Sequence, residues 1–147
     1  MSTLMRTIVL SFVLLGVAGF DCQGAKEPAT PFNAIAKLAS DLSQSDVSGA
    51  VGVFDSSMKG YGSLEQNIES LVAQTEILSA IDVVEDVEKD GVHKMVLDWY
   101  LTLTLQSDNT RTERRREQVN VEMRQIKGKW KITSMSPLTI LDPVNVI

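Results

Sequence analysis

The 147-residue sequence contains only one cysteine and one histidine. A structural zinc site takes four cysteine or histidine ligands, and an intramolecular disulfide takes two cysteines. These residue counts exclude both, and we expect neither a metal site nor a bound cofactor. Packing and hydrogen bonds must therefore hold the folded chain together.

Basic residues are scarce relative to acidic ones. The chain has 14 Lys and Arg against 19 Asp and Glu, which gives a formal net charge of −5 at pH 7. A protein that binds nucleic acid independently of its sequence normally needs a basic surface that neutralises phosphates. We therefore expect no nucleic-acid partner. The length is that of one globular domain.

The first 25 residues have the pattern of a secretory signal peptide. Arg6 is the only charged residue before Asp21, and residues 7–20 are nearly all apolar or small. This apolar stretch is too short to span a membrane as a helix, which takes about 20 apolar residues. Cleavage after Ala18 and cleavage after Ala25 both fit the pattern. We expect an exported protein, either periplasmic or secreted.

Cys22 lies where a bacterial lipoprotein carries its lipidated cysteine. The lipoprotein pattern requires small residues just before the cysteine, whereas this chain has Phe20 and Asp21. We therefore expect no lipid anchor and interpret Cys22 as a lone thiol. The expected division of the chain is a signal peptide at 1–25, a linker at 26–30, a folded domain at 31–142 and a C-terminal tail at 143–147.

Three helices are predicted at the start of the domain. Thr30 is a suitable N-cap, and apolar residues spaced by three and four predict a helix over Pro31–Ser43. Residues 47–58 have a second apolar helical face, although two glycines weaken it. Ser63 and Gln66 form a capping-box sequence, which predicts the start of a third helix.

From residue 75 onward the apolar period changes to two, which is typical of strands. The predicted turns are Asp90-Gly91, 107–109 and Lys127-Gly128. They divide the segment into four strands, and Pro137 predicts a bend or an edge position in the last one, which we expect to run to Ile140. The expected architecture is α+β, with three N-terminal helices packed on a curved antiparallel β-sheet.

Three segments of this chain resemble the nuclear transport factor 2-like, or SnoaL-like, superfamily, which has a cystatin-like cone fold. They are FDSSMKGY at 54–61, the Asp90-Gly91 turn before a strand, and KGKWKITSMSP at 127–137. The resemblance covers residues 31–142. It implies a sheet and helices that enclose a conical cavity, but it does not imply one function, because this fold carries many unrelated activities.

Enzymes of this superfamily place acid–base groups inside the cone, and the resemblance therefore directs attention to inward-facing polar residues. Strict alternation places Ser79, Glu85 and His93 on the inner face, and His93 or Glu85 is a candidate general base. His93 follows a hairpin turn, which favours an exposed position at the rim. No residue of this chain matches the family's catalytic set.

Two functions follow from this reasoning. The first is a non-catalytic domain, which binds a small apolar ligand in its cone or serves as a protein-interaction module. The residues expected to line a ligand site are Phe54, Met58, Tyr61, Met95 and Trp99. The alternative is an enzyme similar to ketosteroid isomerase or to dehydratases, with His93 or Glu85 as the base.

An arginine-rich segment, RTERRRE at 111–117, is polar on both faces of its predicted strand. One interpretation is a partner-binding patch, because arginine binds carboxylates and phosphates through paired hydrogen bonds. The other is a solvated strand end whose charges discourage aggregation. The candidate partner-binding residues are Arg111, Arg114, Arg115 and Arg116.

The outward face of the predicted sheet is mixed and polar. Tyr100, Thr102 and Thr104 lie on one strand, and Gln118 and Asn120 lie on the next. Relatives of this fold often dimerise through this face, so the resemblance implies a homodimer, while a monomer would present a similar face to water.

Overall fold

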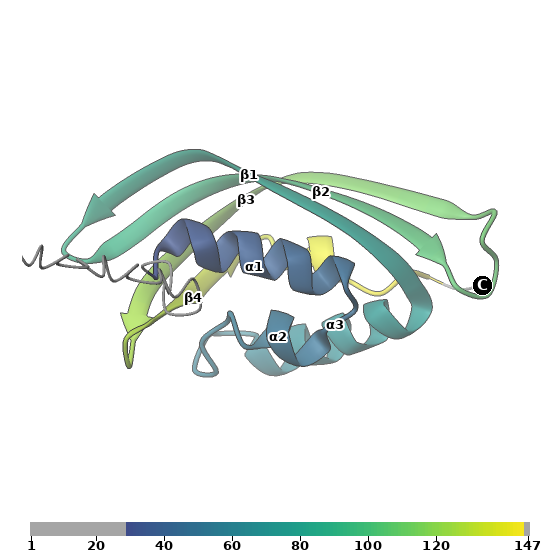
Figure 1. Ribbon diagram of the computed structural model, residues 1–147, viewed down its shortest axis with the longest axis horizontal. Coiled ribbons are helices and arrows are strands. Elements are labelled where there is room, and N and C mark those ends of the chain that lie inside the picture. The colour runs from purple at the N-terminus through teal and green to yellow at the C-terminus, as the bar shows by residue number, and fades with distance from the viewer. Residues whose placement is uncertain (1–28, 146–147) are drawn as a thin grey trace, which may run out of the picture.

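The computed structural model describes residues 29–145, so the expected signal peptide and Cys22 lie outside the described residues. Three helices precede a four-stranded antiparallel sheet with strand order β1-β2-β3-β4, and a short 3-10 helix follows it. Figure 1 shows the curved sheet arching over the helices. The elements are α1 Pro31–Ser43, α2 Val47–Val51, α3 Tyr61–Gln74, β1 Thr75–Lys89, β2 Val92–Leu105, β3 Thr112–Ile126, β4 Lys129–Ser136 and η1 Thr139–Leu141. The α+β prediction is confirmed.

Two tight turns set the register of the meander. Asp90 and Gly91 have φ angles of 54° and 77°, and Lys127 and Gly128 have φ angles of 52° and 78°. Positive φ at both central residues is the backbone of a two-residue hairpin turn that matches the twist of the strands. Both turns lie where the sequence predicts them, and glycine occupies the second position in each because it adopts this conformation without steric cost.

The first helix matches its prediction, whereas the second is much shorter than expected. Thr30 Oγ1 accepts a hydrogen bond from the backbone N–H of Asn33 and caps α1. α2 ends at Val51, because the chain then leaves the helix to pair with β4. The Ile132 N–H donates to the Val53 carbonyl, and the Asp55 N–H donates to the Ile132 carbonyl, each at 2.9 Å. The predicted helix over residues 47–58 is therefore wrong beyond Val51.

The predicted capping box of the third helix does not form. α3 begins at Tyr61, two residues before Ser63, and its N-cap is Gly60 with φ of 83° and no capping side chain. This left-handed residue turns the chain into the helix early, which a side-chain pattern cannot reveal.

Gly49 lies inside α2 at a point where two carboxylates approach closely. A Cβ atom at this position would lie 2.5 Å from Asp46 Oδ2 and 2.6 Å from Asp41 Oδ2. Asp46 caps α2 by accepting from the Gly49 N–H at 2.9 Å. Asp41 is itself buried and pairs with Lys37. The turn between α1 and α2 therefore requires a residue without a side chain here.

One continuous hydrophobic core fills the space between the helices and the inner face of the sheet. Trp99 on β2 is its largest fully buried side chain, and its Nε1–H donates to Ser79 Oγ of β1 at 3.0 Å. Among the side chains packed in this core are Leu38, Leu42, Ile68, Leu71, Leu97, Leu101, Val119 and Ile132. No helix in residues 29–145 is both long and apolar enough to cross a membrane.

β4 ends at Ser136, four residues before the expected end of the last strand. Pro137 follows and has no N–H to donate to a neighbouring strand. The chain bends there, as the sequence predicts, and Leu138 leads into η1 rather than continuing the strand. As a result β4 pairs only with Asn120–Ile126 of β3.

Candidate functional site

The residues predicted to line a ligand site are part of the packed core. Phe54, Met58, Met95 and Trp99 are buried, and Tyr61 is half-buried. Trp99 has 0% of its surface accessible to water, so not even a void of one water molecule lies beside it. A ligand would have to displace these side chains to bind among them. The interior of the cone is therefore filled where the predicted ligand residues lie.

A β-bulge at Val84 overturns the predicted orientation of Glu85. Val83 lies opposite Leu97, but Glu85 lies opposite Val96, so β1 contains one residue more than β2 at this point. The bulge moves Glu85 to the outer face, where it is exposed. Glu85 is therefore wrong as an inward-facing base.

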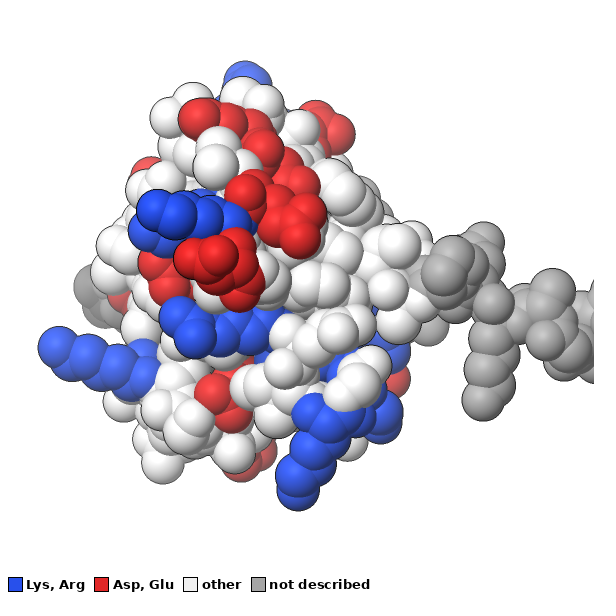
Figure 2. All heavy atoms as spheres, turned by 90° about the vertical axis from the view of Figure 1, so that its left-hand side faces the viewer, with Lys and Arg blue, Asp and Glu red and all other residues white. Residues whose placement is uncertain are grey.

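The same bulge brings Asp86 to the inner face, beside His93. The His93 Nδ1 lies 2.9 Å from Asp86 Oδ1 and 3.1 Å from Oδ2, and its Nε2 lies 3.9 Å from Glu88 Oε2. The Trp130 ring contacts the imidazole edge-on, with 5.0 Å between the ring centres. The His93 side chain is 12% exposed, so the imidazole is more buried than predicted, although it lies beside the hairpin turn. Figure 2 faces this end of the molecule, where acidic and basic side chains lie close together.

This arrangement provides one element of acid–base chemistry. A carboxylate that binds one imidazole nitrogen orients the ring and sets which nitrogen carries the proton. The sequence reasoning missed Asp86 and Trp130. The adjacent apolar pair Val83-Val84, which interrupts the alternation of β1, was the available signal for the bulge.

A surface hollow of about 440 Å³ lies beside Trp130, between the start of α1, α2 and β4. Lys37, Lys129 and Lys131 line it, but Lys37 pairs with Asp41 and Lys131 donates to the Gly52 carbonyl. His93 does not line this hollow. Within the described part of the chain, no three acidic, histidine or cysteine side chains are placed to hold a metal ion.

Two of the four predicted partner-binding arginines are occupied within the molecule. Arg115 is mostly buried, and its Nη1 donates to the backbone carbonyls of Ile140, at 2.9 Å, and Asp142, at 2.5 Å. Arg116 donates from Nε and Nη2 to the two carboxylate oxygens of Asp98, at 3.1 and 2.8 Å. The hydrogen bond from Arg116 lowers the pKa of Asp98 and, together with charge attraction, raises the pKa of Arg116.

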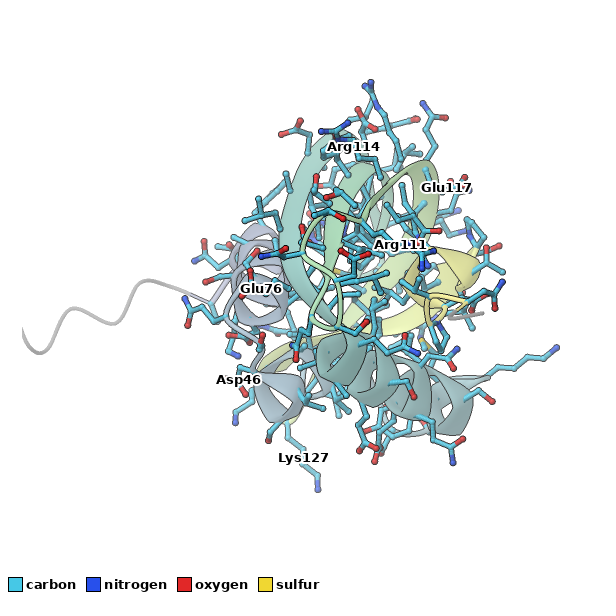
Figure 3. The ribbon with its side chains drawn as sticks, turned by 90° about the vertical axis from the view of Figure 1, so that its right-hand side faces the viewer. Asp46, Glu76, Arg111, Arg114, Glu117 and Lys127 are labelled. Carbon is cyan, nitrogen blue, oxygen red and sulfur yellow. The ribbon has the colours of Figure 1, made fainter. Side chains whose placement is uncertain are left out.

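The other two arginines, Arg111 and Arg114, are exposed. Figure 3 shows Arg114 on the side of the sheet that faces away from α3, while Arg111 and Glu117 lie on the side of the C-terminal segment. Arg114 has no carboxylate within salt-bridge distance in residues 29–145. Its guanidinium is thus available to a partner.

The outer face of the sheet exposes several large apolar side chains. Leu78 is 68% exposed, and Val84, Val87 and Tyr100 are also exposed. A hollow of about 410 Å³ lies around the bulge on this face, and Glu85 and Val96 are among its lining residues. The face is thus less polar than its sequence indicates.

No protein-family model and no curated protein sequence matches this chain. Solved structures do match it. A ketosteroid isomerase-like protein from Erwinia carotovora atroseptica aligns with 76% of this chain and 94% of its own, at 14% identity and a TM-score of 0.60. An NTF2-like superfamily protein from Salmonella enterica serovar Typhimurium aligns over 78% and 89%, at 13% identity and a TM-score of 0.58. The chain has the NTF2-like fold.

A Mycobacterium tuberculosis protein of unknown function is also similar in structure to this chain. It aligns with 71% of this chain at 11% identity and a TM-score of 0.59, and this chain spans 66% of its length. The predicted resemblance to NTF2-like proteins is confirmed at the level of the fold. Identities this low establish the fold alone, and the fold carries many functions.

Proposed function

We propose that this protein is an exported, non-catalytic interaction module built on the NTF2-like fold. The observation that supports this proposal is the filled cone, where Trp99 occupies the space that a ligand would need. Displacing a buried side chain of this size returns apolar surface to water, at a cost of about 1.5–3 kcal/mol for each large residue exposed. A small ligand would have to offset that cost before it bound at all.

Binding of indole tests whether the cone is filled. We expect no binding of indole to the unmodified protein by titration calorimetry. Trp99→Ala removes the indole ring and should create a void that binds free indole, as engineered apolar cavities bind apolar molecules of matching shape. Trp130→Ala, at a half-buried position that adjoins the surface hollow, is the matched control and should bind none. Saturable binding of indole or a ketosteroid to the unmodified protein would contradict the proposal.

An enzyme similar to ketosteroid isomerase is the second candidate, and the pairing of His93 with Asp86 favours it. In this alternative His93 would accept a proton from the substrate, and Asp86 would orient the imidazole. Turnover of a ketosteroid that is lost on His93→Gln and strongly reduced on Asp86→Asn would establish this alternative. Our proposal expects no turnover by the unmodified protein and no difference between the three proteins.

Export is part of the proposal and is supported by the apolar segment at residues 7–20. We expect the protein purified from its native host to lack the first residues of the sequence. Mass spectrometry of the intact chain measures the cleavage point and distinguishes cleavage after Ala18 from cleavage after Ala25. A full-length chain retained in the cell would contradict this part of the proposal.

Homodimerisation through the outer face of the sheet also belongs to the proposal. The exposed side chains of Leu78 and Tyr100 support it, because they lie close together in the register of β1 and β2 on this face. Neighbouring exposed apolar side chains of this kind are typical of a protein interface. The two-fold symmetry of such a dimer would bring the same patch of both copies together.

A further inference from the structure

Part of β3 has no neighbouring strand on one side in residues 29–145. β4 pairs with β3 only from Asn120 to Ile126, since β4 ends at Ser136, opposite Asn120. On its other side, β3 pairs with β2 as far as Thr112. Residues 112–119 of β3 therefore have no strand beside them on this side, although the Arg115 side chain binds the C-terminal segment. We call these residues the β3 edge.

The β3 edge has backbone groups oriented away from the sheet. The Leu105 N–H donates to the Arg111 carbonyl at 3.0 Å, so Arg111 directs its backbone toward β2. In an antiparallel strand, the backbone N–H and C=O groups of successive residues point alternately toward one neighbouring strand and toward the other. The residues whose N–H and C=O groups lie on the open side are therefore Thr112, Arg114, Arg116 and Gln118.

The side chains of these same residues lie on the outer face of the sheet, because Arg116 lies opposite Tyr100 and Arg114 lies opposite Thr102. Arg116 is held by Asp98, while Arg114 has no carboxylate within salt-bridge distance in the described part of the chain. Figure 3 shows Arg114 on the side of the sheet away from the helices. The open backbone edge thus carries positive charge on one face.

This charge pattern disfavours pairing of the β3 edge with a second copy of itself. In an antiparallel pair centred on Arg115, Arg114 of one copy would lie opposite Arg116 of the other. A shift of the register by two residues in either direction would instead place Arg114 opposite Arg114, or Arg116 opposite Arg116. Like charges directly opposite one another destabilise a strand pair. A second copy is therefore a poor occupant of this edge.

We propose that the β3 edge binds an extended acidic segment of another protein as an added strand. In such a segment Asp or Glu alternates with uncharged residues, so that the carboxylates lie on the face of Arg114 and Arg116. Main-chain hydrogen bonds would provide the affinity, and the arginines would select the charge of the partner. This inference rests on the proposed interaction function and names the chemistry of the partner.

The test uses a fluorescein-labelled seven-residue peptide in which threonine alternates with glutamate. We expect saturable binding by fluorescence anisotropy, and at least about tenfold weaker binding to Arg114→Glu, because one attraction becomes a repulsion. Arg124→Glu is the matched control. This substitution makes the same charge change in β3, but at a position where β4 already pairs with the strand. The Arg124→Glu protein should therefore bind the peptide as tightly as the unmodified protein does.

A second peptide separates strand addition from attraction of charge alone. Methylating the backbone nitrogens of alternate residues keeps the glutamates and removes the donors that would pair with the edge. Two methylated peptides are compared, one with methyl groups on the odd-numbered nitrogens and one with them on the even-numbered nitrogens. Only one of these sets faces the β3 edge, and its methylation should weaken binding at least about tenfold. Equal binding of the methylated and unmethylated peptides, or equal binding to Arg114→Glu and Arg124→Glu, would overturn the inference. So would the absence of binding to the unmodified protein.

The peptide test and the indole test can disprove their two proposals separately. If the protein bound indole or turned over a ketosteroid, the non-catalytic proposal would be wrong, but the anisotropy titration would still report on the β3 edge. If the peptide did not bind while the cone excluded indole, the β3 edge would be wrong and the filled cone would stand.

Discussion

The hydrogen bond from Trp99 to Ser79 should contribute measurably to the stability of the core. Trp99 is fully buried, and its Nε1–H has Ser79 Oγ as its acceptor at 3.0 Å. Ser79→Ala would leave this donor unpaired in an apolar environment, at a cost of about 1–3 kcal/mol. That is a large share of the 5–15 kcal/mol that stabilises a typical domain.

A double-mutant cycle isolates this contribution from the effects of volume. Trp99→Phe removes the donor, so Ser79→Ala should cost close to nothing in the Trp99→Phe background. We therefore expect a coupling free energy of about 1–3 kcal/mol between the two substitutions. Urea unfolding followed by circular dichroism measures the four free energies without relying on tryptophan fluorescence.

An exposed serine provides the control for this cycle. Ser134 on β4 is exposed, and Ser134→Ala should show no coupling to Trp99→Phe. If Ser79→Ala costs the same free energy with and without the indole, the hydrogen bond does not stabilise the core.

The remaining predictions concern the turn between α1 and α2, one surface ion pair and the oligomeric state. Gly49→Ala should lower the free energy of unfolding by more than about 1 kcal/mol, because two carboxylates occupy the space of its Cβ. Gly62→Ala should raise the free energy of unfolding by up to about 1 kcal/mol, because its Cβ would meet no atom within 4 Å. Urea unfolding measures both values, and the opposite order of stability would refute this prediction. Arg116 lowers the pKa of Asp98 in the folded state, so this pair should stabilise the protein at pH values above 3.8, the ordinary carboxyl pKa. The stabilisation should be lost as the pH falls through the lowered pKa of Asp98 in the folded protein. Arg116→Leu should return the pKa of Asp98 toward 3.8 in an NMR titration of the carboxyl carbon, and an unchanged value would contradict the assignment. Light scattering should give the mass of a dimer for the unmodified protein and of a monomer for Tyr100→Glu, so a monomer mass at every concentration of the unmodified protein would end the dimer proposal.

Local patterns predicted the elements whose formation depends on neighbouring residues. The Asp90-Gly91 and Lys127-Gly128 turns form where expected, because positive φ is a property of one or two residues. The alternation along β2 is unbroken, and its apolar residues face the core as predicted. Thr30 likewise caps α1 by accepting a hydrogen bond from Asn33, which is only three residues away along the chain.

Predictions failed where distant contacts compete with a local pattern. α2 ends early because Val53 and Asp55 pair with Ile132 on β4, almost 80 residues away along the chain. The Val84 bulge exchanged Glu85 for Asp86 on the inner face, since one extra residue reverses a period of two. Arg115 binds the carbonyl of Ile140, a partner 25 residues away that no local pattern identifies.

The sequence by itself determined the fold class, the acidic balance and the order of helices before strands, since these follow from composition and from the period of apolar residues. Only the tertiary structure decided that the cone is filled, because filling depends on how side chains from several elements share one volume. It likewise decided that His93 meets Asp86 and that part of β3 is an open edge. Those outcomes depend on where strands shift register and end, and side chains far apart in the sequence set both.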